Sequence, residues 1–232
     1  PFLKWLGAEN RLGFPNRGSG IFLTNSLAEP DSMAHRYEFW RVAGQALGLD
    51  LPPREKLPVP ARSGRQVVLV HSGARLSARV WPLGYYHALV QRLRAAGYTV
   101  QVVCDPEQHN SWVALGETTV VSPRTLGELF GLFDRAAVFI GNCSGPGHLA
   151  AVSGVPTFTF FGPSLPEWFA PLHPQAQWLE DKSCPYKPCK DYCHFSTPHC
   201  LENITVEKVW PQLKLFIESH ILSEVPKSTP AS

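Results

Sequence analysis

The chain has 232 residues, 44% of them hydrophobic and 17% charged, so it is long enough to bury a sizeable core. Its formal net charge of +2, with no run of Lys and Arg, excludes the electrostatic footprint of a nucleic-acid-binding protein. No apolar segment reaches the roughly 18–20 residues of a membrane span and no signal peptide opens the chain, so we expect a soluble, cytoplasmic protein, with peripheral membrane contact left open. Because the chain starts at Pro1 and its only methionine is Met33, we also expect it to be part of a longer protein.

The first 60 residues differ in composition from the rest. The stretch RLGFPNRGSGIFLTN (residues 11–25) predicts two short strands around an Asn-Arg-Gly turn. DSMAHRYEFWRVAGQALGL (31–49) predicts a helix capped by Asp31 or Ser32. The proline-rich segment DLPPREKLPVPARSG (50–64) indicates a linker.

From residue 65 the chain alternates between apolar runs and amphipathic stretches. Strands are predicted at 65–73, 99–105, 118–122, 137–141 and 156–162, and helices at 82–98, 110–117, 124–136 and 145–154. Such an alternation predicts an α/β fold with a parallel sheet covered on both faces. In sheets of this kind, ligands bind at the carboxyl ends of the strands.

The last third breaks this rhythm. Residues 163–200 are rich in proline and cysteine and are expected to be loop. A helix is predicted at 205–221, where Pro211 must either kink it or start a second helix. The tail, 223–232, is expected to be disordered.

Two of the predicted loops carry residues that suit an anion. In the first, HSGARLSARVWP (71–82), Gly73 would let main-chain amides approach a phosphate, and Arg75 and Arg79 would neutralise its charge. The pattern alone is equally typical of a turn with solvated arginines.

The second loop, GNCSGPGHLA (141–150), raises the question of a nucleophile. Its spacing does not fit the G-x-S-x-G elbow, and a thiolate at Cys143 would need a base that the sequence does not identify. Phosphate binding requires less, namely the free amides of Ser144, Gly145 and Gly147 at a helix start, with His148 as a further donor. We favour phosphate binding, although His148 could equally be structural.

The cysteine-rich loop, 184–200, has the spacing C-x4-C-x3-C-x6-C, formed by Cys184, Cys189, Cys193 and Cys200. Four thiolates would suit a structural zinc ion or an iron–sulfur cluster. Disulfides, with three pairings open, and free thiols are the alternatives.

Taken in order, these motifs resemble glycosyltransferase family 9, which contains the lipopolysaccharide heptosyltransferases of two-Rossmann-domain (GT-B) architecture. The matching segments are His71–Ala74, Arg79 before Trp81-Pro82, Asp105–Glu107, Gly141–Pro156 and Phe161-Gly162-Pro163. The resemblance implies that residues 61–222 form a Rossmann-like donor-binding domain. It also implies that residues 1–60 are the end of the acceptor domain with its linker.

The resemblance further implies a set of donor-binding residues for a nucleotide-sugar such as an ADP-heptose. It places Ala74, Arg75 and Arg79 near the diphosphate, Glu107 near the nucleoside and Arg124 and Thr125 near the base. Ser144, Gly145 and His148 would contact the phosphates and the sugar, with Gly73 and Cys143 beside them. Where the family usually has an aspartate, this chain has Cys143.

The implied reaction is inverting sugar transfer to a cell-envelope glycan or lipid-linked acceptor, without a metal cofactor, in the cytoplasm or at the inner membrane. Arginines and helix-end amides would stabilise the departing diphosphate, while the catalytic base would lie outside this chain. A second chain could then supply the acceptor domain. The alternatives are a non-catalytic or degenerate subunit whose cysteine loop serves assembly, and, less favoured, a Cys143- or Ser144-dependent hydrolase.

Overall fold

The computed structural model describes residues 5–62, 64–189 and 192–221, which fall into two compact units. The first unit comprises Pro1–Pro58 with Glu167–Phe169, and the second comprises Val59–Pro166 with Ala170–Ser232. The disorder expected for residues 223–232 falls outside the described residues. Within the described residues, no helix combines the length and the apolar character that crossing a bilayer requires.

The first unit contains few regular elements. They are β1 (Leu12–Gly13), η1 (Asn16–Phe22), β2 (Asn25–Ser26), α2 (Arg36–Ala46) and η2 (Arg54–Lys56). The short strands β1 and β2 pair in parallel, and the expected second strand around Phe22 is instead the end of a 3-10 helix. Helix α2 starts five residues later than predicted, because His35 Nδ1, not Asp31 or Ser32, accepts its capping hydrogen bond from Tyr37 N (3.1 Å).

The second unit is built on a five-stranded parallel sheet of order β4-β3-β5-β6-β7. The strands are β3 (Val67–His71), β4 (Thr99–Val103), β5 (Ala136–Asn142), β6 (Thr157–Phe161) and β7 (Gln177–Glu180). The helices are η3 (Ser77–Arg79), α3 (Leu83–Ala95), η4 (Pro106–Gln108), α4 (His109–Ala114), α5 (Leu126–Phe133), α6 (Gly145–Val152), α8 (His199–Glu202) and α9 (Val206–Ile221). Helix α7 (Pro166–Phe169) starts at Pro166 of the second unit, but its residues Glu167–Phe169 belong to the first unit. The predicted α/β fold with a parallel sheet is therefore confirmed.

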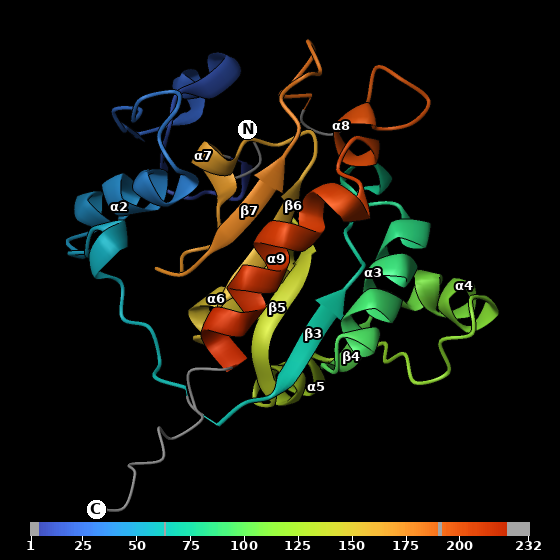
Figure 1. Cartoon of the computed structure of the whole chain (residues 1–232). Coiled ribbons are helices and arrows are strands. Elements are labelled where there is room, and N and C mark those ends of the chain that lie inside the picture. The colour runs from blue at the N-terminus through green and yellow to red at the C-terminus, as the bar shows by residue number, and fades with distance from the viewer. Residues whose placement is uncertain (1–4, 63, 190–191, 222–232) are drawn as a thin grey trace, which may run out of the picture. The chain divides into compact units, whose positions relative to one another are not determined.

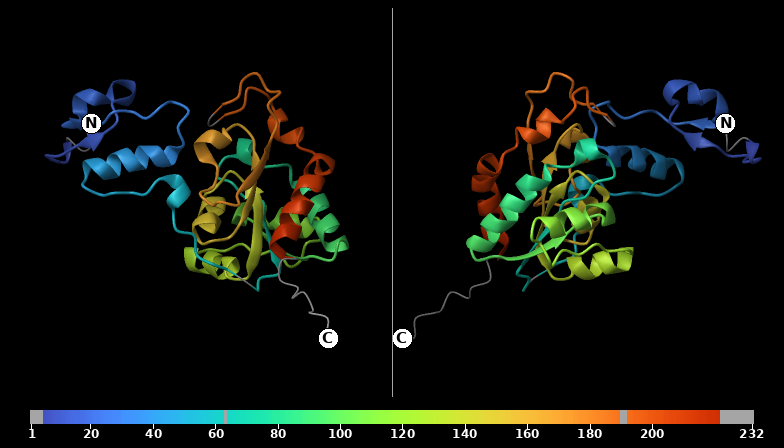
Figure 2. Two further views of the ribbon diagram at one scale, coloured as in Figure 1. Left: turned by 60° about the vertical axis from the view of Figure 1, so that its left-hand side comes forward. Right: turned by 90° about the vertical axis from the view of Figure 1, so that its right-hand side faces the viewer.

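Helices cover both faces of this sheet, which explains why its central strands consist mostly of apolar residues. On one face α3 and α9 pack over Val70, Ile140 and Phe160, and on the other α5 and α6 pack over Leu69 and Phe139. Figure 1 shows α3 and α9 in front of the sheet, and the views in Figure 2 place α5 and α6 behind it. Every residue of β5 and β6 is buried, as expected for strands with both faces covered.

Two predictions in this unit need correction. The expected strand at 118–122 is reduced to a single bridge between Val121 and Val103. The segment expected to be loop contains the edge strand β7. Pro211 lies inside one helix, α9, so of the two alternatives left open for it, the start of a second helix is excluded.

Candidate functional site

The candidate site lies at the carboxyl edge of the five-stranded sheet. Because β3 is hydrogen-bonded to both β4 and β5, the loops that follow these three strands are neighbours. They contain residues 71–82, 105–108 and 142–148, which include most of the predicted donor-binding residues. The sheet topology thus brings together segments that lie far apart in the sequence.

The first loop requires glycine at position 73. Gly73 N donates a hydrogen bond to His71 Nδ1 (3.1 Å), and a Cβ at this glycine would overlap the Asp105 carboxylate. The main chain at Gly73 therefore approaches the loop after β4 more closely than a residue with a Cβ would allow. The role predicted for Gly73, an approach of main-chain amides to a phosphate, stays a prediction, since the group close to it here is a side chain.

His71 stays neutral despite its acidic neighbour. Its Nε2 lies 3.9 Å from Asp105 Oδ1, which would favour the imidazolium, but burial lowers the pKa of His71 to about 4. Burial prevails because the Asp105 carboxylate is partly solvated and because Nδ1 must keep a lone pair for the Gly73 amide. The pKa of Asp105 is itself raised by burial and by the nearby Glu107 carboxylate.

In the loop after β5, Cys143 is buried and its thiol is expected to be unreactive. The Ser164 hydroxyl donates a hydrogen bond to its sulfur, and the positive charge of Arg79 acts on it as well. Burial outweighs both and raises the pKa of the Cys143 thiol to about 11. At neutral pH Cys143 is therefore a thiol, which is the unreactive form, and its surroundings do not suit a nucleophile.

Ser144 directly precedes α6, and its side-chain hydroxyl has no hydrogen-bond partner among the described residues. Its Oγ is buried. It does not cap α6, although serine commonly does so at this position. A buried hydroxyl beside the main-chain amides of a helix start is a feature of a ligand site. A serine hydrolase would instead need a base hydrogen-bonded to this hydroxyl, and the described residues supply none.

The other predicted residues differ in how closely they join this group. Ala74, Arg79 and His148 are half-buried, whereas Arg75, Glu107 and Gly145 are exposed. Arg124 and Thr125 are also exposed. Thr125 Oγ1 accepts from Glu128 N (3.2 Å) and so caps α5, which is a structural role that the motif comparison did not predict.

The structure adds two residues that sequence reasoning missed. Asn142, the last residue of β5, is buried and hydrogen-bonds to both ends of the loop 71–82. Trp81 is fully buried, stacks on Phe160 at 4.2 Å between ring centroids, and donates from Nε1 to Ile204 O (2.7 Å). All of these partners are distant in sequence, so no local pattern could have revealed them.

The four clustered cysteines lie near one another and are free thiols, as are Cys104 and Cys143. Burial raises the pKa of the Cys200 thiol to about 11; Lys187 opposes this effect, and the other three cysteines of the loop add to it. Among the residues that the model describes, no three Cys, His, Asp or Glu side chains are arranged to hold a metal ion. The four thiols of the cysteine-rich loop thus lie near one another, but they do not have the arrangement of metal ligands.

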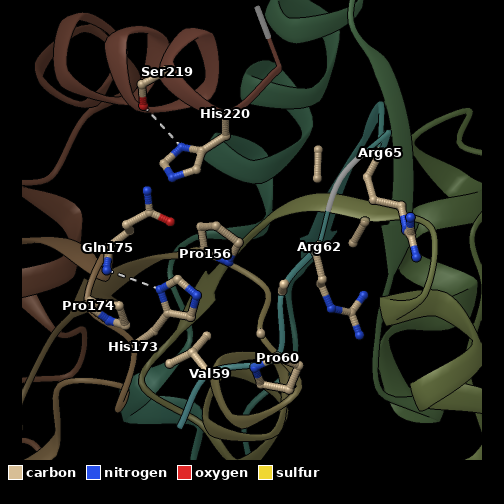
Figure 3. Close-up of a pocket in the computed structure, with 14 residues that line it drawn as sticks. Val59, Pro60, Arg62, Arg65, Pro156, His173, Pro174, Gln175, Ser219 and His220 are labelled. Atoms are coloured by element: carbon tan, nitrogen blue, oxygen red, sulfur yellow. Dashed lines mark hydrogen bonds between the residues drawn. The ribbon is translucent and has the colours of Figure 1, made fainter. Parts of the chain in front are cut away.

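A cavity of about 330 Å³ lies at the opposite, amino-terminal edge of the sheet, lined in part by Pro60, Arg62, His173 and His220. Figure 3 shows the Arg62 side chain turned away from the two histidines. Its guanidinium donates to Ser153 O (2.5 Å) and Phe133 O (2.7 Å), at the ends of α6 and α5. The cation is therefore used to fasten the linker to two helix carboxyl termini, and we do not assign the donor to this cavity.

Comparisons with known proteins identify the family. The family model for "Glycosyltransferase family 9 (heptosyltransferase)" matches residues 36–197. The chain is 26% identical to lipopolysaccharide heptosyltransferase 1 of Pseudomonas aeruginosa over 190 residues, which is 73% of this chain and 52% of that protein. It is 30% identical to lipopolysaccharide heptosyltransferase 3 of Escherichia coli over 108 residues, which is 43% of this chain and 32% of that protein. The chain thus spans about half or less of the length of these relatives.

Solved structures agree on the fold. E. coli ADP-heptose lipopolysaccharide heptosyltransferase II superposes with a TM-score of 0.70 at 18% identity, covering 94% of this chain and 72% of that one. E. coli heptosyltransferase WaaC with ADP gives 0.60 at 16% identity, covering 87% and 61%. The iron-containing dodecameric glycosyltransferase TibC of enterotoxigenic E. coli gives 0.55 at 22% identity, covering 78% and 53%. Since the family model matches well over half of the chain and the sheet carries the family's motifs at its carboxyl edge, the chain belongs to glycosyltransferase family 9.

Proposed function

We propose that the second unit binds the nucleotide-sugar donor of a heptosyltransferase-like glycosyltransferase. The observation that carries this proposal is the convergence of the loops 71–82 and 142–148 beside the start of α6, with the Arg79 charge acting at Cys143 and a buried, unmatched Ser144 hydroxyl. Main-chain amides, a cation and a hydroxyl are the groups that bind a diphosphate. The relative solved with ADP has the same fold, which supports an adenine nucleotide-sugar.

Calorimetric titration of the protein with ADP, UDP and GDP tests the donor class. ADP should bind with the highest affinity, and Arg79→Ala should weaken it by about tenfold, because a charge-assisted contact to phosphate is lost. Arg135→Ala is the matched control, since Arg135 is exposed and lies at the amino-terminal edge of the sheet, just before β5. Equal affinities for the three nucleotides, or equal effects of the two variants, would contradict the assignment.

For the reaction, we propose inverting transfer of a heptose-like sugar to a cell-envelope glycan or lipid-linked acceptor, without a divalent metal. Arg79, Arg75 and the amides at the start of α6 would stabilise the diphosphate as it leaves. We assign the catalytic base to acceptor-domain residues outside these 232, and we assign residues 1–60 to the end of that domain and 61–222 to the donor domain. Activity of the full enzyme should survive EDTA, and the anomeric configuration of the product, read by NMR, should be opposite to that of the donor.

A degenerate, non-catalytic role is the second candidate, and Cys143 is the observation that favours it. A neutral thiol replaces the carboxylate usual in the family, so hydrogen bonds from sugar hydroxyls would lose their best acceptor. Restoring the carboxylate with Cys143→Asp should raise transfer or donor binding if the chain is degenerate. If wild-type protein already transfers sugar and C143D is slower, the thiol belongs to an active enzyme.

We also propose that Cys184, Cys189, Cys193 and Cys200 hold a structural zinc ion or iron–sulfur cluster. The thiols are close enough to shift one another's pKa, and thiolate sulfur suits both metals. The iron-containing relative of similar fold supports iron. Elemental analysis with an absorption spectrum separates zinc from iron. Cys189→Ser should remove the metal and Cys104→Ser should not, whereas metal-free wild-type protein would contradict the proposal.

A further inference from the structure

The side chain of Asn142 connects the two loops to which we assign the donor. Asn142 Nδ2 donates to Ser72 O (2.8 Å) and to Gly73 O (3.3 Å), and its Oδ1 accepts from Trp81 N (2.9 Å) and Tyr86 Oη (2.9 Å). We propose that Asn142 is a positioning residue that holds the two loops in the arrangement required for donor binding. This inference rests on the proposed donor site.

The chemistry of its partners fixes the orientation of the amide. The carbonyls of Ser72 and Gly73 can only accept a hydrogen bond, so they must face the NH₂ group, and the main-chain N–H of Trp81 can only donate, so it must face the oxygen. Two donors and two acceptors are thereby satisfied in a side chain that is only 1% exposed. A carboxylate or an apolar group of the same shape would leave several of these buried groups unpaired.

The positions of these partners explain why the contact matters for a ligand. Ser72 and Gly73 begin the first loop and Trp81 ends it, so one side chain joins both ends of the segment that carries Arg75 and Arg79. Asn142 also directly precedes the buried Cys143 and the half-buried Ser144 in the loop 142–148. The side-chain amide of Asn142 therefore sets the distance between the loop 71–82, which carries Arg75 and Arg79, and the start of α6.

A purely structural role would not require such a network. Thr159, directly opposite Gly141 on the neighbouring strand β6, is equally buried and its hydroxyl has no partner among the described residues. The core thus tolerates an unmatched polar group one strand away from Asn142. Thr159→Val, which removes that hydroxyl at constant shape, is the matched control for any substitution of Asn142.

The first measurement needs no nucleotide. Hydrogen–deuterium exchange should show that Asn142→Leu accelerates exchange of the amides of residues 73–81 by about tenfold or more, because hydrogen bonds are lost at both ends of the loop. Amides of α9 should be unchanged, and T159V should leave both regions as in the wild type. Uniform acceleration throughout the second unit, or none in 73–81, would overturn the inference.

The second measurement uses ADP and the nearly isosteric variant Asn142→Asp. When protonated, this carboxyl can still donate to Ser72 O and accept from Trp81 N, but its ionised form faces two carbonyl oxygens. The ADP affinity of N142D relative to wild type should be near one at acidic pH and fall about tenfold or more as the carboxyl ionises, while N142L should be weak throughout. If both variants bind ADP as the wild type does across this range, Asn142 does not position the site. If wild-type protein fails to bind ADP, the donor proposal fails, while the exchange experiment still decides whether Asn142 connects the loops.

Discussion

Replacing Gly154 by alanine tests how the linker is held against the second unit. Gly154 follows α6 with φ +82°, and a Cβ there would overlap the carbonyl oxygen of Pro60. The same linker is held by Arg62, whose guanidinium donates to Ser153 O. The substitution therefore combines an unfavourable backbone conformation with displacement of a docked segment.

The two contributions can be separated with a second glycine. Gly97 also has positive φ, +88°, but nothing lies within 4 Å of its missing Cβ. Gly97→Ala should thus cost only the left-handed conformation, about 1 kcal/mol of unfolding free energy. Gly154→Ala should cost about 2 kcal/mol more, because the overlap forces main-chain atoms apart. The total of about 3 kcal/mol corresponds to a fall in Tm of about 6–12 °C.

Thermal and urea unfolding of the two variants and the wild type supply the measurement. We expect G154A to be clearly less stable than G97A, and cleavage by a protease within residues 59–65 to be faster in G154A alone. Equal losses in the two variants would show that Pro60 does not press on Gly154. In that case the reasoning about a docked linker would be wrong.

Three further predictions concern the site itself. Trp81→Phe should lower the unfolding free energy by about 2–4 kcal/mol, because Ile204 O loses its buried hydrogen-bond donor and the smaller ring leaves a void. Urea denaturation measures this loss, and a value under about 1 kcal/mol would refute the prediction. The pKa of His71 is lowered to about 4 in the folded chain against about 6.5 when exposed, so its contribution to stability is intact above pH 6.5 and is lost as the pH falls to 4. Between pH 7 and pH 4, this titration should lower the unfolding free energy of the wild type by about 3 kcal/mol, and the His71→Asn variant should lack this contribution. Because burial raises the pKa of Cys143 to about 11, iodoacetamide at pH 8 should alkylate Cys143 only after the protein has been unfolded. Peptide mass spectrometry detects the alkylated residue, and alkylation of the native protein would show that the thiol is accessible and reactive.

Strands β3 to β6 could be predicted because they are rich in apolar and β-branched residues and because glycine or proline lies near their ends. β5 and β6 are buried on both faces, so their sequences contain almost no competing signal. Gly97, two residues beyond the end of α3, adopts the positive φ that such a helix end favours, although the predicted helix 82–98 extended past it. Local chemistry decided these elements, and local chemistry is visible in a sequence.

Elements at the edges of the sheet were missed for the opposite reason. β7 is an edge strand within a proline-rich stretch, and its residues are mostly half-buried, so neither alternation nor an apolar run marks it. The segment around Val121 has the composition of a strand but pairs with β4 at one residue only. In both places the tertiary context, and not the propensity of the segment, determined the outcome.

The candidate site shows the same division. Gly73, Arg79 and Ser144 were identifiable because glycine, cations and small residues at strand ends have direct physical meaning. Asn142 was not, because a single asparagine at the end of a strand reveals nothing of four partners drawn from Ser72 to Tyr86. A hydrogen-bond network between segments that are distant in sequence produces no periodic pattern of residue types from which it could be predicted.

The bond from the Trp81 indole to Ile204 O has a consequence for synthesis of the protein. The two residues are separated by 123 positions, so Trp81 is made long before its partner leaves the ribosome. The part of the sheet face that α9 covers also stays exposed until α9 has been translated. The loop 71–82, which contains Trp81, should therefore reach its final form only after α9 has been made, and a chain truncated before α9 should be a target for chaperones and proteases.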